Sequence, residues 1–63
     1  MPIAQIFLVE GRDEDQKRAV IEKVTNALCE AVAAPREAVR VIITEMPKTQ
    51  FGIGGKSVKD LGR

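Results

Sequence analysis

The sequence predicts an α/β fold made of one β-α-β unit with parallel strands, followed by a short C-terminal hairpin. Two apolar segments rich in β-branched residues, at 2–9 and 39–45, flank a long segment with helical periodicity. A strand, helix and second strand within 63 residues indicate one domain, 1–63, with a right-handed crossover between its strands. We expect partner subunits to complete the sheet.

The first strand is expected at 2–9, where the sequence Pro-Ile-Ala-Gln-Ile-Phe-Leu-Val is almost entirely apolar. Glu10-Gly11-Arg12 interrupts this run. Asp13, with Gln16 three residues later, matches a capping box and predicts that a helix begins near Glu14.

The helix is expected to continue to about Ala33, because the residue before Pro35 disfavours the helical conformation. Apolar residues recur at spacings of three and four and predict one packed stripe: Val20, Ile21, Val24, Ala27, Leu28, Ala31 and Val32. On the exposed side the spacing predicts two ion pairs, Asp13 with Lys17 and Glu14 with Arg18.

The second strand is expected at 39–45, because five of its seven residues, Val-Arg-Val-Ile-Ile-Thr-Glu, are β-branched. Pro47 ends it. The glycine-rich segment 51–55 predicts a tight turn or small hairpin, and the polar residues 56–63 are expected to fray.

Size and composition point to a homo-oligomer. A chain this short buries only about 60% of its unfolded surface and needs an additional stabilising feature. Cys29 is the only cysteine and there is no histidine, so neither an internal disulfide nor a usual zinc site is available. A single helix also covers only one face of a parallel sheet, which normally has both faces covered. We therefore expect another copy of the chain on the bare face.

Charge and hydropathy argue against other partners. The net charge is +1, and the two aromatic residues are both phenylalanine, which gives no basis for nucleic-acid binding. No apolar run approaches the roughly 20 residues that span a membrane, and no signal-like segment opens the chain. We expect a soluble, cytoplasmic protein without metal or cofactor.

Pro2 is the candidate catalytic base, since a chain without histidine lacks the usual Ser-His and Cys-His pairs. Removal of Met1 would leave Pro2 with a free secondary amine. The pKa of an unperturbed α-amino group is about 7.7–8.0, and burial or a nearby cation lowers it toward the range that suits proton transfer. The alternative interpretation is that Pro2 simply begins a strand.

Arg12 and Arg40 are the candidate anion-binding residues. Arg12 follows Gly11 at the junction of strand and helix, where anions are stabilised, although it could equally be a solvated loop residue. Arg40 lies within an apolar strand and could bind a carboxylate, face outward or form a salt bridge to a neighbouring subunit. Phe51, carried by the glycine-rich segment, could form an apolar pocket wall or a subunit contact.

Four segments together resemble the 4-oxalocrotonate (2-hydroxymuconate) tautomerase family of the tautomerase superfamily. They are Pro-Ile-Ala-Gln-Ile at 2–6, Glu-Gly-Arg at 10–12, Val-Arg-Val-Ile-Ile-Thr-Glu-Met at 39–46 and Phe-Gly-Ile-Gly-Gly at 51–55. Phe7 stands where familiar members carry histidine, at a position outside the catalytic set, and the stretch from residue 56 onward is less similar.

The resemblance implies an isomerase that moves a proton between the enol and keto forms of unsaturated 2-hydroxy acids. Pro2 would be the base, Arg40 of a neighbouring subunit would hold the first carboxylate and the 2-oxygen, and Arg12 of another would bind the distal carboxylate. Phe51 would line the pocket, and the N–H of Val9 would order a water. The resemblance also implies a hexamer assembled as a trimer of dimers, with a role in the catabolism of aromatic compounds.

Two other functions remain open at this point. The same scaffold could support a dehalogenase or decarboxylase of small unsaturated acids. Alternatively, the same arginines could serve an oligomer that binds small acids without converting them.

Overall fold

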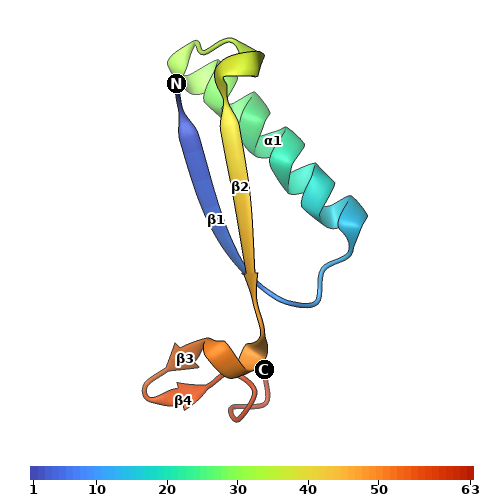
Figure 1. Cartoon of the computed structure of the whole chain (residues 1–63), viewed down its shortest axis with the longest axis vertical. Coiled ribbons are helices and arrows are strands. Elements are labelled where there is room, and N and C mark those ends of the chain that lie inside the picture. Colours follow the sequence, from blue (N-terminus) through green and yellow to red (C-terminus); the bar gives the residue numbers. More distant parts are fainter.

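The computed structural model describes residues 1–63 and confirms the β-α-β order, with parallel strands and a C-terminal hairpin (Figure 1). Strands β1 and β2 pair in parallel, in a register that runs from Ile3 opposite Arg40 to Val9 opposite Met46. The elements are β1 (Ile3–Val9), α1 (Glu14–Val32), η1 (Arg36–Ala38), β2 (Arg40–Met46), η2 (Lys48–Gln50), β3 (Gly52–Ile53) and β4 (Lys56–Ser57).

Helix α1 begins with the predicted capping box. The Asp13 carboxylate accepts a hydrogen bond from the Gln16 N–H, and the Gln16 side chain accepts one from the Asp13 N–H. The helix ends at Val32, one residue earlier than expected, because Ala33 adopts a left-handed conformation with φ 55°.

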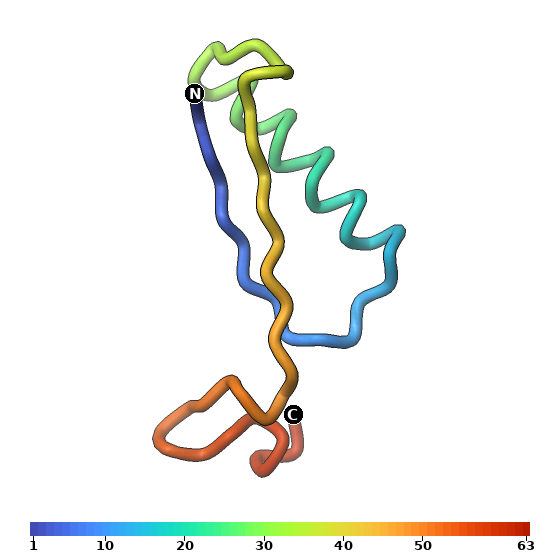
Figure 2. The backbone as a smooth tube through the Cα atoms, in the orientation of Figure 1, coloured from blue at the N-terminus to red at the C-terminus, as the bar shows by residue number.

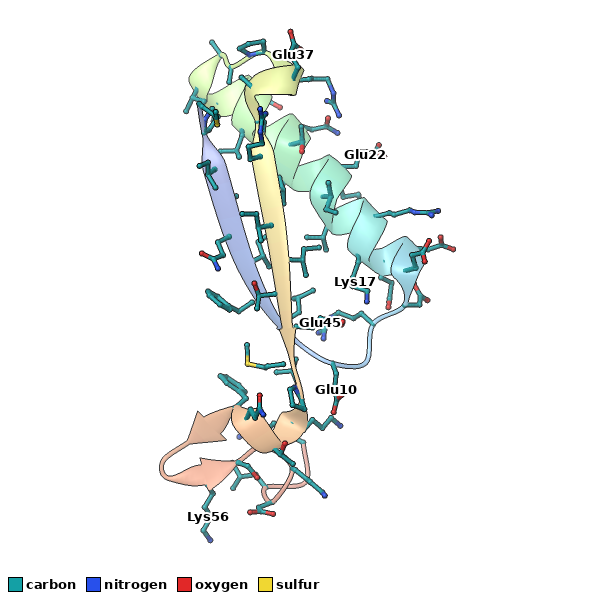
Figure 3. The ribbon with its side chains drawn as sticks, in the orientation of Figure 1. Glu10, Lys17, Glu22, Glu37, Glu45 and Lys56 are labelled. Atoms are coloured by element: carbon teal, nitrogen blue, oxygen red, sulfur yellow. The ribbon has the colours of Figure 1, made fainter.

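One predicted ion pair of the helix is confirmed and the other is wrong. Arg18 pairs with Glu14, as the spacing indicates. Lys17 instead reaches Glu45 at the end of β2, at 3.1 Å, because Asp13 uses its carboxylate to cap the helix. This bond joins the first half of α1 to the sheet, as the two labelled side chains in Figure 3 show.

The two faces of the sheet differ. Side chains at alternate positions, including Ala4, Ile6, Val41 and Ile43, are half-buried. Those pointing the other way are open to solvent, and their apolar members are Ile3 at 62% exposure, Phe7 at 59% and Ile42 at 49%. We call Ile3, Phe7 and Ile42 the bare-face residues. In the single chain this face is uncovered, as expected from one helix.

The predicted stripe of α1 is also only partly packed. Val20, Val24 and Leu28 are half-buried, whereas Ile21 and Val32 remain exposed. Two strands form too narrow a sheet to cover the whole apolar surface of a 19-residue helix.

The C-terminal segment is ordered, contrary to the expectation that it frays. Strands β3 and β4 pair antiparallel across a turn in which Gly54 and Gly55 have φ values of 61° and 89°. Val58 follows β4 and, at 5% exposure, is the most buried side chain of the chain. Its N–H donates to the Phe51 carbonyl at 2.8 Å, and the Arg63 N–H donates to the Val58 carbonyl at 3.0 Å, so the tail folds back on itself.

The isolated chain is more extended than a self-sufficient domain. Its radius of gyration is 14.6 Å, whereas a compact chain of this length has about 11 Å. Its accessible surface is 4750 Å², against about 4000 Å² for a folded monomer of this mass. With Val58 as its only buried residue, the chain acquires a core only by association with other subunits.

Candidate active site

The predicted site residues form two groups at opposite ends of the β1–β2 pair. Pro2 and Arg40 lie where β1 and β2 begin, and the Arg40 N–H donates to the Pro2 carbonyl at 3.0 Å. Val9, Arg12 and Phe51 lie toward the other end, where both strands finish (Figure 2). Pro2 and Val9 are seven residue steps apart along an extended strand, a distance of roughly 23 Å. One chain therefore does not bring the two groups together.

At the first end, the Arg40 side chain is exposed and is held by a backbone carbonyl. Its Nη1 donates to the Glu37 oxygen at 2.6 Å. The turn η1 that carries Glu37 is tied to α1 by a hydrogen bond from Arg36 to Asn26. No carboxylate of the chain pairs with Arg40, so its outer N–H groups are free for a ligand or a neighbouring subunit.

Pro2 lies half-buried beside this turn, whereas Met1 is 78% exposed. A terminal residue that is this accessible can be reached by a processing enzyme. The nitrogen of Pro2 is an amide while Met1 is attached, and its removal would create an amine at the start of β1.

At the other end the chain forms a pocket with a volume of about 270 Å³. Its apolar wall comes from four side chains, Val9, Phe51, Ile53 and Val58, and its polar lining from four others, Glu10, Arg12, Lys48 and Arg63. Arg12 is anchored by an Nη1 hydrogen bond to the Val9 carbonyl at 3.1 Å, which turns its guanidinium toward the end of β1. Cationic groups above an apolar wall suit an organic anion.

Five pocket residues were not predicted from the sequence: Glu10, Lys48, Ile53, Val58 and Arg63. They come from three separate segments that only the fold brings together. The Glu10 Oε1 accepts a hydrogen bond from the Lys48 N–H at 3.3 Å, which joins the loop of Arg12 to the loop of Phe51. The available signal was the presence of two apolar residues, Val58 and Leu61, within an otherwise polar tail.

The chain contains no cluster of three or more metal-ligating side chains. No helix has the length and apolarity to cross a membrane. The predicted site residues thus form two separate features, Pro2 with Arg40 at one end and a pocket with cationic and apolar lining at the other. In an oligomer, one subunit's first end and another's pocket can form a single site.

Comparison with known proteins gives consistent results. The model of the family "Tautomerase enzyme" matches residues 2–61. The chain is 62% identical to a 2-hydroxymuconate tautomerase of Comamonas testosteroni, over 100% of both sequences. It is 66% identical to a solved 4-oxalocrotonate tautomerase isozyme of Methylibium petroleiphilum, with a TM-score of 0.94, covering 98% of this chain and 100% of that one.

A more distant solved relative is a heterohexameric 4-oxalocrotonate tautomerase of Chloroflexus aurantiacus. It is 34% identical, with a TM-score of 0.92, and the match covers 97% of this chain and 98% of the relative. The agreement extends over the whole length, and it includes both strands, the helix and the C-terminal hairpin. The chain therefore belongs to the tautomerase enzyme family, a family of isomerases.

Proposed function

We propose that this chain catalyses the enol-keto isomerisation of 2-hydroxymuconate and similar unsaturated 2-hydroxy acids, with Pro2 as general base. The observation that carries the proposal is the 62% identity, without gaps in coverage, to a 2-hydroxymuconate tautomerase. The cationic, apolar-walled pocket supports it, because such a substrate is a conjugated apolar chain with a carboxylate at each end.

In this mechanism the amine of processed Pro2 takes the proton from the 2-hydroxyl group. The electrons of the broken O–H bond form the 2-keto group, and the conjugated double bonds shift by one position. The proton then returns from Pro2 to a carbon further along the chain, so that the reaction is a net isomerisation. A base with a pKa near neutral serves both transfers.

The other predicted residues bind and polarise the substrate. Arg40 holds the first carboxylate and the 2-oxygen, where negative charge develops. Arg12 binds the distal carboxylate and draws electron density toward that end. Phe51 forms the apolar wall that keeps the Pro2 amine neutral, because burial disfavours the charged form. The N–H of Val9 orders a water near the substrate oxygen.

We further propose that the active assembly is a hexamer formed as a trimer of dimers. Dimers would join two β1–β2 pairs into a four-stranded sheet, and three such sheets would cover one another's bare faces. The separation of Pro2 from the pocket supports an assembly in which each site draws on more than one subunit. The heterohexameric relative has the same fold and nearly the same length.

The decisive experiment combines an intact-mass measurement with an ultraviolet assay of 2-hydroxymuconate ketonisation on one sample. We expect a mass lacking one methionine. We also expect kcat/KM to rise with pH through a single ionisation with a pKa below about 7.7–8.0, because the neutral amine is the base. Pro2→Ala should lose at least about 100-fold in kcat/KM and keep the parent assembly by sedimentation.

Two results would contradict the proposal. Full activity with Met1 retained would mean that another group is the base, because an amide nitrogen cannot accept this proton. Processed protein without turnover would favour a dehalogenase, a decarboxylase or a binding oligomer on the same scaffold. Assays with 3-halo-acrylates and with unsaturated 2-oxo diacids would then separate these alternatives.

A further inference from the structure

The pocket contains a lysine to which the proposed mechanism gives no role. Lys48 lines it together with Arg12, and Glu10 is the only acidic side chain of the lining. Ion pairs elsewhere in the chain use Lys17 and Arg18, but none involves Lys48. Lys48 is therefore a lining residue whose ammonium group has no carboxylate partner within the chain.

The backbone of Lys48 is held on both sides. Its N–H donates to the Glu10 Oε1 at 3.3 Å, and its carbonyl accepts a hydrogen bond from the Lys59 N–H at 3.3 Å. The first bond holds the Glu10 carboxylate against the main chain of Lys48. The second ties the start of η2 to the folded C-terminal segment. The base of the lysine side chain thus has a defined position at the pocket rim.

An unpaired cation beside an apolar wall favours a bound anion. Its attraction for a carboxylate is stronger there than in bulk water, since Val9, Phe51, Ile53 and Val58 displace solvent from one side. Arginine binds a carboxylate with fixed fork geometry, whereas lysine acts as a mobile point charge. Lys48 and Arg12 can therefore act on one carboxylate from different directions.

We propose that Lys48 is a specificity-determining residue that recognises the distal carboxylate together with Arg12, so that the site prefers dicarboxylates over monocarboxylates. The inference rests on the proposed function, because it assigns the pocket to the distal end of that substrate. It goes further by naming a second cation and the substrate class that it selects. Lys48 takes no part in proton transfer.

The test uses two stable six-carbon probes, trans,trans-muconate and sorbate. They share the conjugated chain, but sorbate carries a methyl group in place of the distal carboxylate. Binding to the assembled protein is measured by calorimetry for the parent, Lys48→Met and Lys48→Arg. Lys56→Met is the matched control, because Lys56 lies on β4 outside the pocket lining and its labelled side chain points away from the molecule (Figure 3).

We expect Lys48→Met to weaken muconate binding about tenfold, which is about 1.4 kcal/mol, with less than about a twofold change for sorbate. Lys48→Arg should restore most of the affinity, because it keeps the charge. Lys56→Met should leave both probes unaffected. Lys48→Gln replaces Lys48→Met in the same test if the methionine variant does not assemble.

Unchanged muconate binding, or equal weakening for both probes, would overturn the assignment. The proposed function is judged separately, by turnover of 2-hydroxymuconate in the parent protein. A parent without turnover that still prefers muconate through Lys48 would refute the tautomerase assignment of the substrate and support this inference. A parent with full turnover whose muconate binding does not depend on Lys48 would support the proposed function and refute this inference.

Discussion

Truncation of Phe7 tests whether the bare-face residues form the interior of the assembly. Phe7 is 59% exposed in the single chain, and it lies on the same face as Ile3 and Ile42. A phenylalanine buries roughly 150–250 Å² when fully covered, so the exposed part is roughly 90–150 Å². At about 25 cal/mol per Å², covering it stabilises the assembly by about 2–4 kcal/mol per subunit.

Phe7→Ala should therefore weaken subunit association at least roughly 30-fold per subunit, the factor that corresponds to about 2 kcal/mol. Sedimentation velocity over a dilution series measures the concentration at which the assembly dissociates. Gln5→Ala is the matched control, because Gln5 lies on the same strand and is exposed on the same face but ends in a polar amide. A dissociation midpoint for Phe7→Ala equal to that of the parent would refute the interior placement of this face.

Two further predictions concern the arginines proposed to bind the substrate, and the helix cap. Arg40→Ala and Arg12→Ala should each lower kcat/KM for 2-hydroxymuconate at least about tenfold, because each removes a charged hydrogen-bonding group, while the assembly stays intact. Parent-like kinetics in both variants would contradict the assigned roles. Asp13→Ala should reduce the free energy of unfolding by about 1 kcal/mol, because the Gln16 N–H loses the carboxylate that accepts its hydrogen bond. Urea unfolding at equal protein concentration measures this, and an unchanged midpoint would show that the cap contributes nothing.

Much of the protomer fold could be predicted because its signals are local. The Asp13 and Gln16 capping pair, the proline at position 35 and the β-branched run in β2 each act within a few residues of the chain. The structure has element boundaries within one residue of those expected: β1 begins at Ile3, and β2 runs from Arg40 to Met46. Gly54 and Gly55 likewise marked the turn, because their positive φ values favour glycine.

The errors occurred where a residue makes its contact with a segment that is distant in the sequence. Lys17 was assigned to Asp13 from its spacing, yet it pairs with Glu45, 28 residues away. The C-terminal residues were expected to fray because they are polar, yet Val58 packs against the pocket and is hydrogen-bonded to Phe51. No local pattern indicates either contact.

The sequence by itself determined the order of elements, the helix cap, the lack of a disulfide or histidine base, and the need for partner subunits. These features follow from residue type and short-range spacing, which act before the chain is folded. The family motifs likewise pointed to Pro2, Arg12, Arg40 and Phe51 as one set.

Only the tertiary structure decided where these residues lie. A parallel pair of strands puts both strand starts at one end and both strand ends at the other, so Pro2 and Arg12 are separated within a chain. The pocket, with Lys48 and Glu10 on its rim, exists because η2 and the C-terminal tail return to the end of β1. Such contacts depend on the path of the whole chain, and residue spacing alone does not encode that path.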